Sequence, residues 1–290
     1  MGKVLNLDGS LTPNAESYER IIAFQNACLN NTPDDIKITF KGCKFICPNL
    51  LTIIGALPLL GERCKKKIEL DLDTIDDLNV RACVSCSGFL NYINPTVEKD
   101  YATKNAIKFD RFNINEKDNI LKLMTYIYSI IALFPVNMEQ QVKDALAGNL
   151  YEIFNNAFLH SNSEIGIFGC GYYFSANKVL YFSLYDAGVG VPMNVRNYLN
   201  NKNIASDKTL EWAFTLGNST AKGRDYRGGL GFDLIKDFVM LNGGDASLYS
   251  CDANASITKQ GVKFNTINQE LLGTIFSIRI KSDERKYVMV

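Results

Sequence analysis

The order of four segments in the middle of the chain restricts the fold more than any other feature. Residues 118–134 and 138–160 have helical length, and Pro135 separates them because proline interrupts a helix. Residues 165–174 and 179–185 are rich in apolar and aromatic residues, as strands are. Two strands joined by a short turn pair antiparallel. The order therefore predicts helices on one face of a mostly antiparallel sheet.

Local signals in these segments agree with that arrangement. Asn137 is the expected N-cap of the second helix, with Gln140 three residues later. Asn177 can adopt the positive φ that suits the turn between the two strands. Apolar residues recur along one side of the second helix and predict the stripe that the sheet covers: Leu146, Leu150, Ile153 and Ala157.

The N-terminal part of the chain reads as strand, helix, strand. Residues 36–40 and 67–72 alternate between apolar and polar, and residues 49–61 between them form an apolar segment of helical length. Such a unit predicts a parallel sheet. Residues 91–119 lack a sustained period, so we expect the linker there.

The chain is therefore expected to have an α/β fold with two domains. Residues 1–104 form a small α/β domain with the linker, and residues 105–290 form the second domain. The second domain is completed by a helix after Gly231, a strand near residues 245–250 and a closing strand at residues 274–280.

Composition restricts the partners. Lysine plus arginine and aspartate plus glutamate both number 31, so no global field attracts nucleic acid or anionic lipid. The N-terminus lacks a signal-peptide core, and the longest apolar runs, residues 50–60 and 126–136, are too short to cross a bilayer. We expect a cytoplasmic protein without nucleic-acid or membrane partners. The eight cysteines are expected as reduced thiols, the alternative being a zinc site formed by Cys43, Cys47, Cys83 and Cys86.

A polar stripe follows the helix at residues 138–160. Glu152, Asn156 and His160 are four residues apart, so their side chains lie on nearly the same face. A carboxylate there could deprotonate a nucleophile, and an amide oxygen could complete the oxygen shell of a magnesium ion held by phosphates. The alternative is an ordinary solvated helix face.

A second motif follows the strand at residues 179–185. Asp186 at the end of that strand can accept a hydrogen bond from an exocyclic amine, while Gly188 and Gly190 let the backbone approach a flat base. The alternative is a tight turn without a ligand.

The third motif is glycine-rich and precedes a helix. Glycines before a helix N-terminus expose backbone N–H groups, which together with the helix dipole bind anions. Lys222, Arg224 and Arg227 lie close enough in sequence to neutralise phosphates. The alternative is a glycine-rich loop without a ligand. The glycine-rich stretch itself consists of Gly228, Gly229, Leu230 and Gly231.

In this order the motifs resemble those of the GHKL, or Bergerat-fold, ATPases. Glu152-x-x-x-Asn156-Ala-x-x-His160 is similar to their N box, Asp186-x-Gly-x-Gly to G1, and residues 228–231 to G2. Gly273-Thr274 is similar to their final Gly-Thr pair. The resemblance covers roughly the last 170 residues and implies an α/β sandwich of the Bergerat type for residues 105–290. Other nucleotide-binding signatures, the P-loop and the dinucleotide fingerprint, are not present in the sequence.

The resemblance implies a role for each motif. Asn156 would ligate magnesium, Asp186 would contact the adenine amine with support from Thr274, and Glu152 would activate water or an acceptor hydroxyl. Residues 191–227 would form the ATP lid. The residues expected to bind the nucleotide are Asn156, His160, Asp186, Gly188, Gly190, Ser219, Thr220, Lys222, Gly228, Gly229, Leu230, Gly231 and Thr274.

Three functions remain open. The first is a magnesium-dependent switch that binds and hydrolyses ATP and couples lid closure to a protein partner or a second copy of the chain. The second is a serine/threonine kinase with Glu152 as base, because the N-box pattern is similar to that of anti-sigma-factor serine kinases. The third is a nucleotide-binding scaffold without turnover. Since His160 is the only histidine, a sensor kinase that phosphorylates its own histidine is not expected.

The segment at residues 36–72 resembles a STAS core in its order of strand, polar turn, apolar helix and strand. STAS antagonists carry an acceptor serine just before the apolar helix, whereas this chain has Cys47, Pro48 and Asn49 there. The resemblance therefore implies a docking or dimerisation module rather than a phosphorylation substrate. The alternative is an unrelated small α/β domain.

Overall fold

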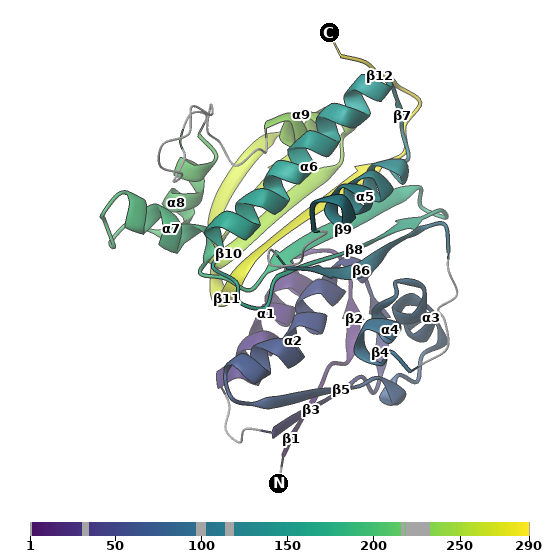
Figure 1. The fold of residues 1–290 in the computed structure, drawn as a ribbon, viewed down its shortest axis with the longest axis vertical. Coiled ribbons are helices and arrows are strands. Elements are labelled where there is room, and N and C mark those ends of the chain that lie inside the picture. The colour runs from purple at the N-terminus through teal and green to yellow at the C-terminus, as the bar shows by residue number, and fades with distance from the viewer. Residues whose placement is uncertain are drawn as a thin grey trace.

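The computed structural model describes residues 2–30, 35–96, 103–113, 119–215, 218 and 233–289. An N-terminal α/β unit lies beneath a long antiparallel sheet, and helices cover the far side of that sheet (Figure 1). The chain is thus a mixed α/β protein, as expected.

The N-terminal unit contains a three-stranded parallel sheet in the order β1-β3-β5. The predicted strand, helix and strand at residues 36–72 are confirmed as β3 (Asp35–Thr39), α2 (Leu51–Arg63) and β5 (Lys67–Asp71). Alternate residues of both strands are buried, which explains their period of two. The remaining elements of the unit are β1 (Lys3–Asn6), β2 (Gly9–Leu11), α1 (Ala15–Asn30), β4 (Cys43–Ile46), η1 (Pro48–Leu50), η2 (Leu72–Thr74), α3 (Leu78–Cys86) and α4 (Phe89–Ile93).

The larger sheet has five strands in the order β10-β11-β9-β8-β6, and all neighbouring strands are antiparallel. Three helices pack on one of its faces: α5 (Asn119–Ala132), α6 (Gln140–His160) and α9 (Asp233–Asn242). The predicted layer of helices on an antiparallel sheet is confirmed. The strands are β6 (Ala106–Phe112), β8 (Ile167–Phe174), β9 (Val179–Asp186), β10 (Asp245–Thr258) and β11 (Gly261–Lys281).

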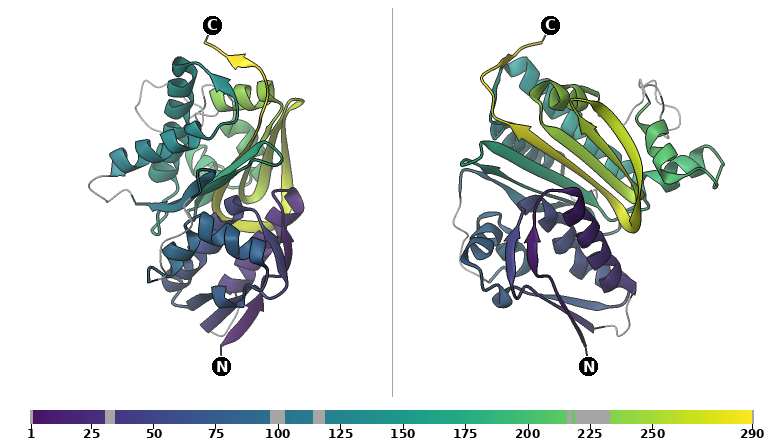
Figure 2. Two further views of the ribbon diagram at one scale, coloured as in Figure 1. Left: turned by 90° about the vertical axis from the view of Figure 1, so that its right-hand side faces the viewer. Right: turned by 180° about the vertical axis from the view of Figure 1, so that it is seen from behind.

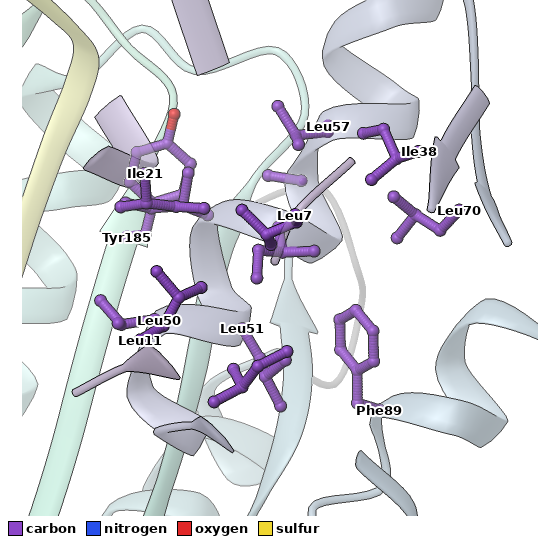
Figure 3. Packing of buried hydrophobic residues seen from close by; sticks show 14 of the residues in the cluster. Leu7, Leu11, Ile21, Ile38, Leu50, Leu51, Leu57, Leu70, Phe89 and Tyr185 are labelled. Carbon is purple, nitrogen blue, oxygen red and sulfur yellow. The ribbon is translucent and has the colours of Figure 1, made fainter. Parts of the chain in front are cut away.

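The N-terminal unit covers the other face of this sheet. One cluster of buried side chains joins residues of the unit, such as Ile21 and Leu50, to Phe168, Tyr185 and Ile275 of the sheet. Figure 3 shows Tyr185 in the same packed layer as Ile21 and Leu50. Seen from behind, α1 lies against the lower part of the sheet (Figure 2). The two parts of the chain therefore share a hydrophobic core.

One expectation about extended structure is wrong, and a second is confirmed but has bounds that are too short. The segment at residues 91–119, expected as a linker, contains the edge strand β6, whose register with β8 shifts between Ile107 and Asp110 and so interrupts the alternation. The strands near residues 245–250 and 274–280 are much longer than predicted. They continue into one hairpin, because further pairs extend from Cys251 opposite Leu271 to Thr258 opposite Gly261, with two register shifts.

Two expectations about helix and turn residues are also wrong. Asn137 is not an N-cap, because it belongs to β7 (Asn137–Met138), which pairs with β12 (Lys286–Tyr287). The helix begins after Glu139, whose side chain makes no capping bond. In the turn between β8 and β9 the positive φ of 51° belongs to Lys178 rather than Asn177. A left-handed residue at the last position is usual in hairpin turns longer than two residues.

None of the helices in the described part of the chain combines the length and apolar composition that crossing a bilayer requires.

Candidate functional site

A pocket opens between α6, the sheet and two short helices that follow β9. These helices are α7 (Gly190–Tyr198) and α8 (Ser206–Ala213), which project from the side of the molecule (Figure 1). The pocket contains about 830 Å³ of empty space, part of it open to solvent. That size is typical of sites for small ligands and cofactors. Its polar lining residues are Asn156, His160, Ser161, Asp186, Asn194, Asn218 and Thr274.

Five of the residues predicted from sequence line this one pocket. Asn156 and His160 come from α6, Asp186 and Gly190 from the end of β9 and the start of α7, and Thr274 from β11. Residues separated by more than a hundred positions are thus brought together.

Two other predicted residues lie beside the pocket rather than in its lining. The backbone N–H of Gly188 donates a 3.0 Å hydrogen bond to Oδ1 of Asp186, so Gly188 supports the pocket from behind. Glu152 is exposed on α6, one turn before Asn156, and does not line the pocket.

The remaining predicted residues lie outside the described residues. Arg224 and Arg227 also lie outside the described residues. Of the expected lid at residues 191–227, the structure describes residues 191–215 and 218, which include most of α7 and all of α8. The predicted nucleotide-binding residues concerned are Ser219, Thr220, Lys222, Gly228, Gly229, Leu230 and Gly231.

The turn after β9 is held against the end of α6. The backbone N–H of Val189 donates to the carbonyl of Ser161 at 2.8 Å, and Nδ2 of Asn194 donates to the carbonyl of His160 at 2.8 Å. A Cβ on Gly188 would lie 2.0 Å from the carbonyl oxygen of Ser161. Only glycine therefore fits at this contact, which places Asp186 opposite the last turns of α6.

Gly190 and Gly273 also occupy positions that other residues cannot. Both have positive φ, 79° and 103°. A Cβ on Gly190 would lie 2.6 Å from Sγ of Cys251, and one on Gly273 would lie 1.9 Å from the carbonyl oxygen of Asp186. The fold itself requires these glycines, so the cavity and its polar groups, rather than the glycines, point to a ligand.

Asp186 has an unusual electrostatic environment. Its side chain is 6% exposed, and burial raises the pKa of the carboxyl from 3.8 to about 7. The backbone N–H groups of Gly188 and Thr274 hydrogen-bond the carboxylate and partly oppose this rise in pKa. A buried carboxylate of this kind is an acceptor suited to N–H donors of a bound ligand.

Ser250 and Trp212 also shape the pocket, and sequence reasoning missed both. Ser250, fully buried on β10, accepts a hydrogen bond from the N–H of Val191 at 2.9 Å, and its Oγ lies 2.9 Å from Oγ1 of Thr274. It thereby joins the start of α7 to β11. Trp212 on α8 lines the pocket and lies beside Tyr198, with ring centroids 5.6 Å apart. A single serine or tryptophan has no spacing that would have marked it.

Two candidate metal sites differ in their capacity to hold an ion: the pocket for magnesium, and the four cysteines Cys43, Cys47, Cys83 and Cys86 for zinc. Asn156 provides an amide oxygen at the pocket, which suits magnesium when phosphates and water supply the other ligands. Within the part of the chain that the structure describes, no three His, Cys, Asp or Glu side chains are grouped as metal ligands. Burial raises the pKa of Cys43 to about 11 and of Cys83 to about 12, so both favour the thiol form that binds metals poorly.

No protein-family model matches this chain, and none of the curated proteins matches it either. The geometry of the pocket is therefore the basis for assigning a function.

Proposed function

We propose that this protein is a magnesium-dependent, ATP-hydrolysing switch of the GHKL type, which binds ATP in the pocket between α6, β9, β11 and the α7–α8 pair. The observation that carries the proposal is the convergence of the buried carboxyl of Asp186 and the half-buried amide of Asn156 on one cavity of suitable size.

The adenine base would occupy the inner part of the pocket. Asp186 accepts a hydrogen bond from the exocyclic amine, and the hydroxyl of Thr274, which Ser250 orients, supports that contact. Apolar side chains of the lining, including Ile153, Val195 and Phe276, suit the faces of a flat base.

The triphosphate would extend along α6. The amide oxygen of Asn156 would hold a magnesium ion together with the phosphates, and the ion would offset the phosphate charge. The helix α9 begins at Asp233, two positions after the end of the glycine-rich residues 228–231, an order in sequence that suits phosphate binding at a helix N-terminus. Glu152, one turn before Asn156, takes the proton from the attacking oxygen.

A serine/threonine kinase is the second candidate, and the exposure of Glu152 favours it. A base that is accessible from outside the pocket can be reached by a hydroxyl of a partner protein as well as by water. The N-terminal unit, with its STAS-like segment, would then serve in docking or dimerisation. If neither reaction occurs, the protein is a nucleotide-binding scaffold.

The experiment follows ATP binding and turnover in the same protein. Trp212 is the only tryptophan and lines the pocket, so its fluorescence reports on binding. We expect ATP with magnesium to change this fluorescence, and Glu152→Ala to stop phosphate release while the affinity for ATP changes less than about threefold. Unchanged phosphate release in Glu152→Ala would remove the catalytic role of Glu152. Absence of any ATP binding by the unmodified protein would refute the proposed function.

A further inference from the structure

A closed ring of hydrogen bonds lies behind the pocket, on the face of the sheet that the N-terminal unit covers. Nε2 of Gln25 donates to Oη of Tyr185 at 2.7 Å, and Oη of Tyr185 donates to the carbonyl of Leu272 at 2.6 Å. The N–H of Leu272 donates back to Oε1 of Gln25 at 3.0 Å. Gln25 and Tyr185 are fully buried. A cyclic network of buried hydrogen bonds, in which every polar group has a partner, holds its members in one arrangement.

The ring joins an N-terminal helix to the two strand ends that form the site. Gln25 belongs to α1, Tyr185 directly precedes Asp186 on β9, and Leu272 directly precedes Gly273 and Thr274 on β11. Successive residues of a strand point to opposite faces, so Tyr185 enters the shared core while Asp186 enters the pocket.

Leu272 occupies a place where the sheet provides less support. The pairing of β11 with β10 jumps from Thr274 opposite Ser250 to Leu271 opposite Cys251, which leaves Leu272 and Gly273 outside the ladder. The ring bonds both the N–H and the carbonyl of Leu272. Two residues later, the N–H of Thr274 hydrogen-bonds the carboxylate of Asp186.

We propose that Gln25 and Tyr185 are positioning residues for the nucleotide site: through Leu272 and β9 they hold Thr274 and Asp186 in the geometry that accepts the adenine amine. The inference rests on the proposed binding of ATP. Neither residue lines the pocket, so they act on the nucleotide only through the two strands. The N-terminal unit thereby contributes to ATP affinity from the opposite face of the sheet.

The same interface contains a matched control. Tyr18, also on α1 and 4% exposed, donates through Oη to Oγ of Ser277 at 2.6 Å and accepts from Nδ2 of Asn49 at 2.7 Å. Ser277 lies three residues beyond Thr274 along β11. Tyr18→Phe therefore removes a buried, bonded tyrosine hydroxyl from the same interface without breaking the ring.

The test compares the full chain with Tyr185→Phe, Gln25→Met and Tyr18→Phe. Each variant is expected to lower Tm, because each leaves buried partners unsatisfied. In titrations with ATP and magnesium well below the lowest Tm, we expect Tyr185→Phe and Gln25→Met to weaken binding about five- to tenfold and Tyr18→Phe less than about twofold. Tyr185→Phe, which removes one oxygen atom, keeps the test decisive if Gln25→Met does not fold.

A double variant shows whether the ring acts through Asp186. If it does, Tyr185→Phe causes no further loss of affinity once Asp186→Asn is present, because the two changes disrupt the same contact. Equal loss in both backgrounds would overturn the inference. The inference would also be overturned if Tyr185→Phe loses stability but binds ATP with the same affinity as Tyr18→Phe. In that case the ring is only structural, and the proposed function stands. If the unmodified protein does not bind ATP, or Asp186→Asn binds it equally well, the adenine site itself is refuted and the inference falls with it.

Discussion

The two faces of the five-stranded sheet are used in different ways. The face toward the N-terminal unit is filled by packed side chains such as Phe168 and Tyr185, whereas the face toward α6 leaves a cavity at one end of its core. Along β9 the alternation is strict near the site: Tyr185 is in the shared core, and Leu184 and Asp186 line the pocket. The packed face thus supports a cavity on the other face that is lined by both polar and apolar residues, which is an arrangement suited to holding a site in place.

The largest expected effect concerns the packed face. Phe168 is fully buried among Phe109, Tyr92 and Tyr185, so Phe168→Ala should reduce the free energy of unfolding by about 3–5 kcal/mol. Because the core is shared, we expect one urea transition for the whole chain, shifted as a unit. Phe182→Ala, an equally buried phenylalanine in the core of the opposite face, is the matched comparison. Two separate transitions, of which only one shifts, would contradict a shared core.

The next effect concerns the ionisation of Asp186. Its pKa is raised from 3.8 to about 7 in the folded protein, so folding favours the protonated carboxyl. This contribution to stability is fully present below pH 3.8 and is lost as the pH rises through about 7. Above pH 7, the ionised carboxyl therefore lowers the free energy of unfolding by at most about 4 kcal/mol relative to its protonated form.

Asp186→Asn removes the cost of burying an ionised carboxyl, so the ligand-free variant should be more stable than the unmodified protein at pH 8. Thermal unfolding from pH 5 to pH 8 should show the difference growing with pH, while ATP binds the variant more weakly because an amide can donate where an acceptor is needed. A variant that is less stable at every pH would contradict the assigned cause of the pKa shift.

A smaller effect concerns the turn that closes the pocket. Gly188→Ala places a Cβ against the Ser161 carbonyl and should cost about 1–3 kcal/mol, accompanied by weaker ATP binding, since the turn must move away from α6. Gly148→Ala is the control, because this exposed glycine of α6 has no atom within 4 Å of its added Cβ. For this control we expect the free energy of unfolding to rise by about 0.5–1 kcal/mol without a change in ATP affinity. If Gly188→Ala changes neither stability nor ATP affinity, the turn can move away from the Ser161 carbonyl without cost and the prediction is wrong.

Elements with strong periods were predictable, and irregular ones were not. The α6 stripe and the β8–β9 pair have clear patterns, whereas β6 has an interrupted register and the middle of β11 alternates among polar residues, which hides the long hairpin. The sequence did contain a signal that the N-terminal unit covers the other face of the sheet. Most residues of β8 and β9 are buried, on both faces, and strands with continuous apolar runs are usually covered on both sides.

The convergence of candidate residues on one pocket was predictable where several motifs had to agree. Asn156, Asp186 and Thr274 were found from the order of three motifs, and the structure brings them to one pocket. Ser250, Trp212 and Gln25 reach the site or its support from elements whose sequences have no distinguishing pattern. Their positions depend on tertiary packing, which one sequence does not reveal.

The position of β11 in the sheet has a consequence for how the protein is made. This strand lies between β9 and β10, although it follows both in the sequence. During synthesis the sheet therefore stays open along β9 until residues up to about 281 have left the ribosome, and the wall containing Thr274 cannot form earlier. Such late, long-range pairing is typical of slow folding. In that interval the nascent chain leaves the edge of β9 unpaired, and unpaired strand edges favour aggregation.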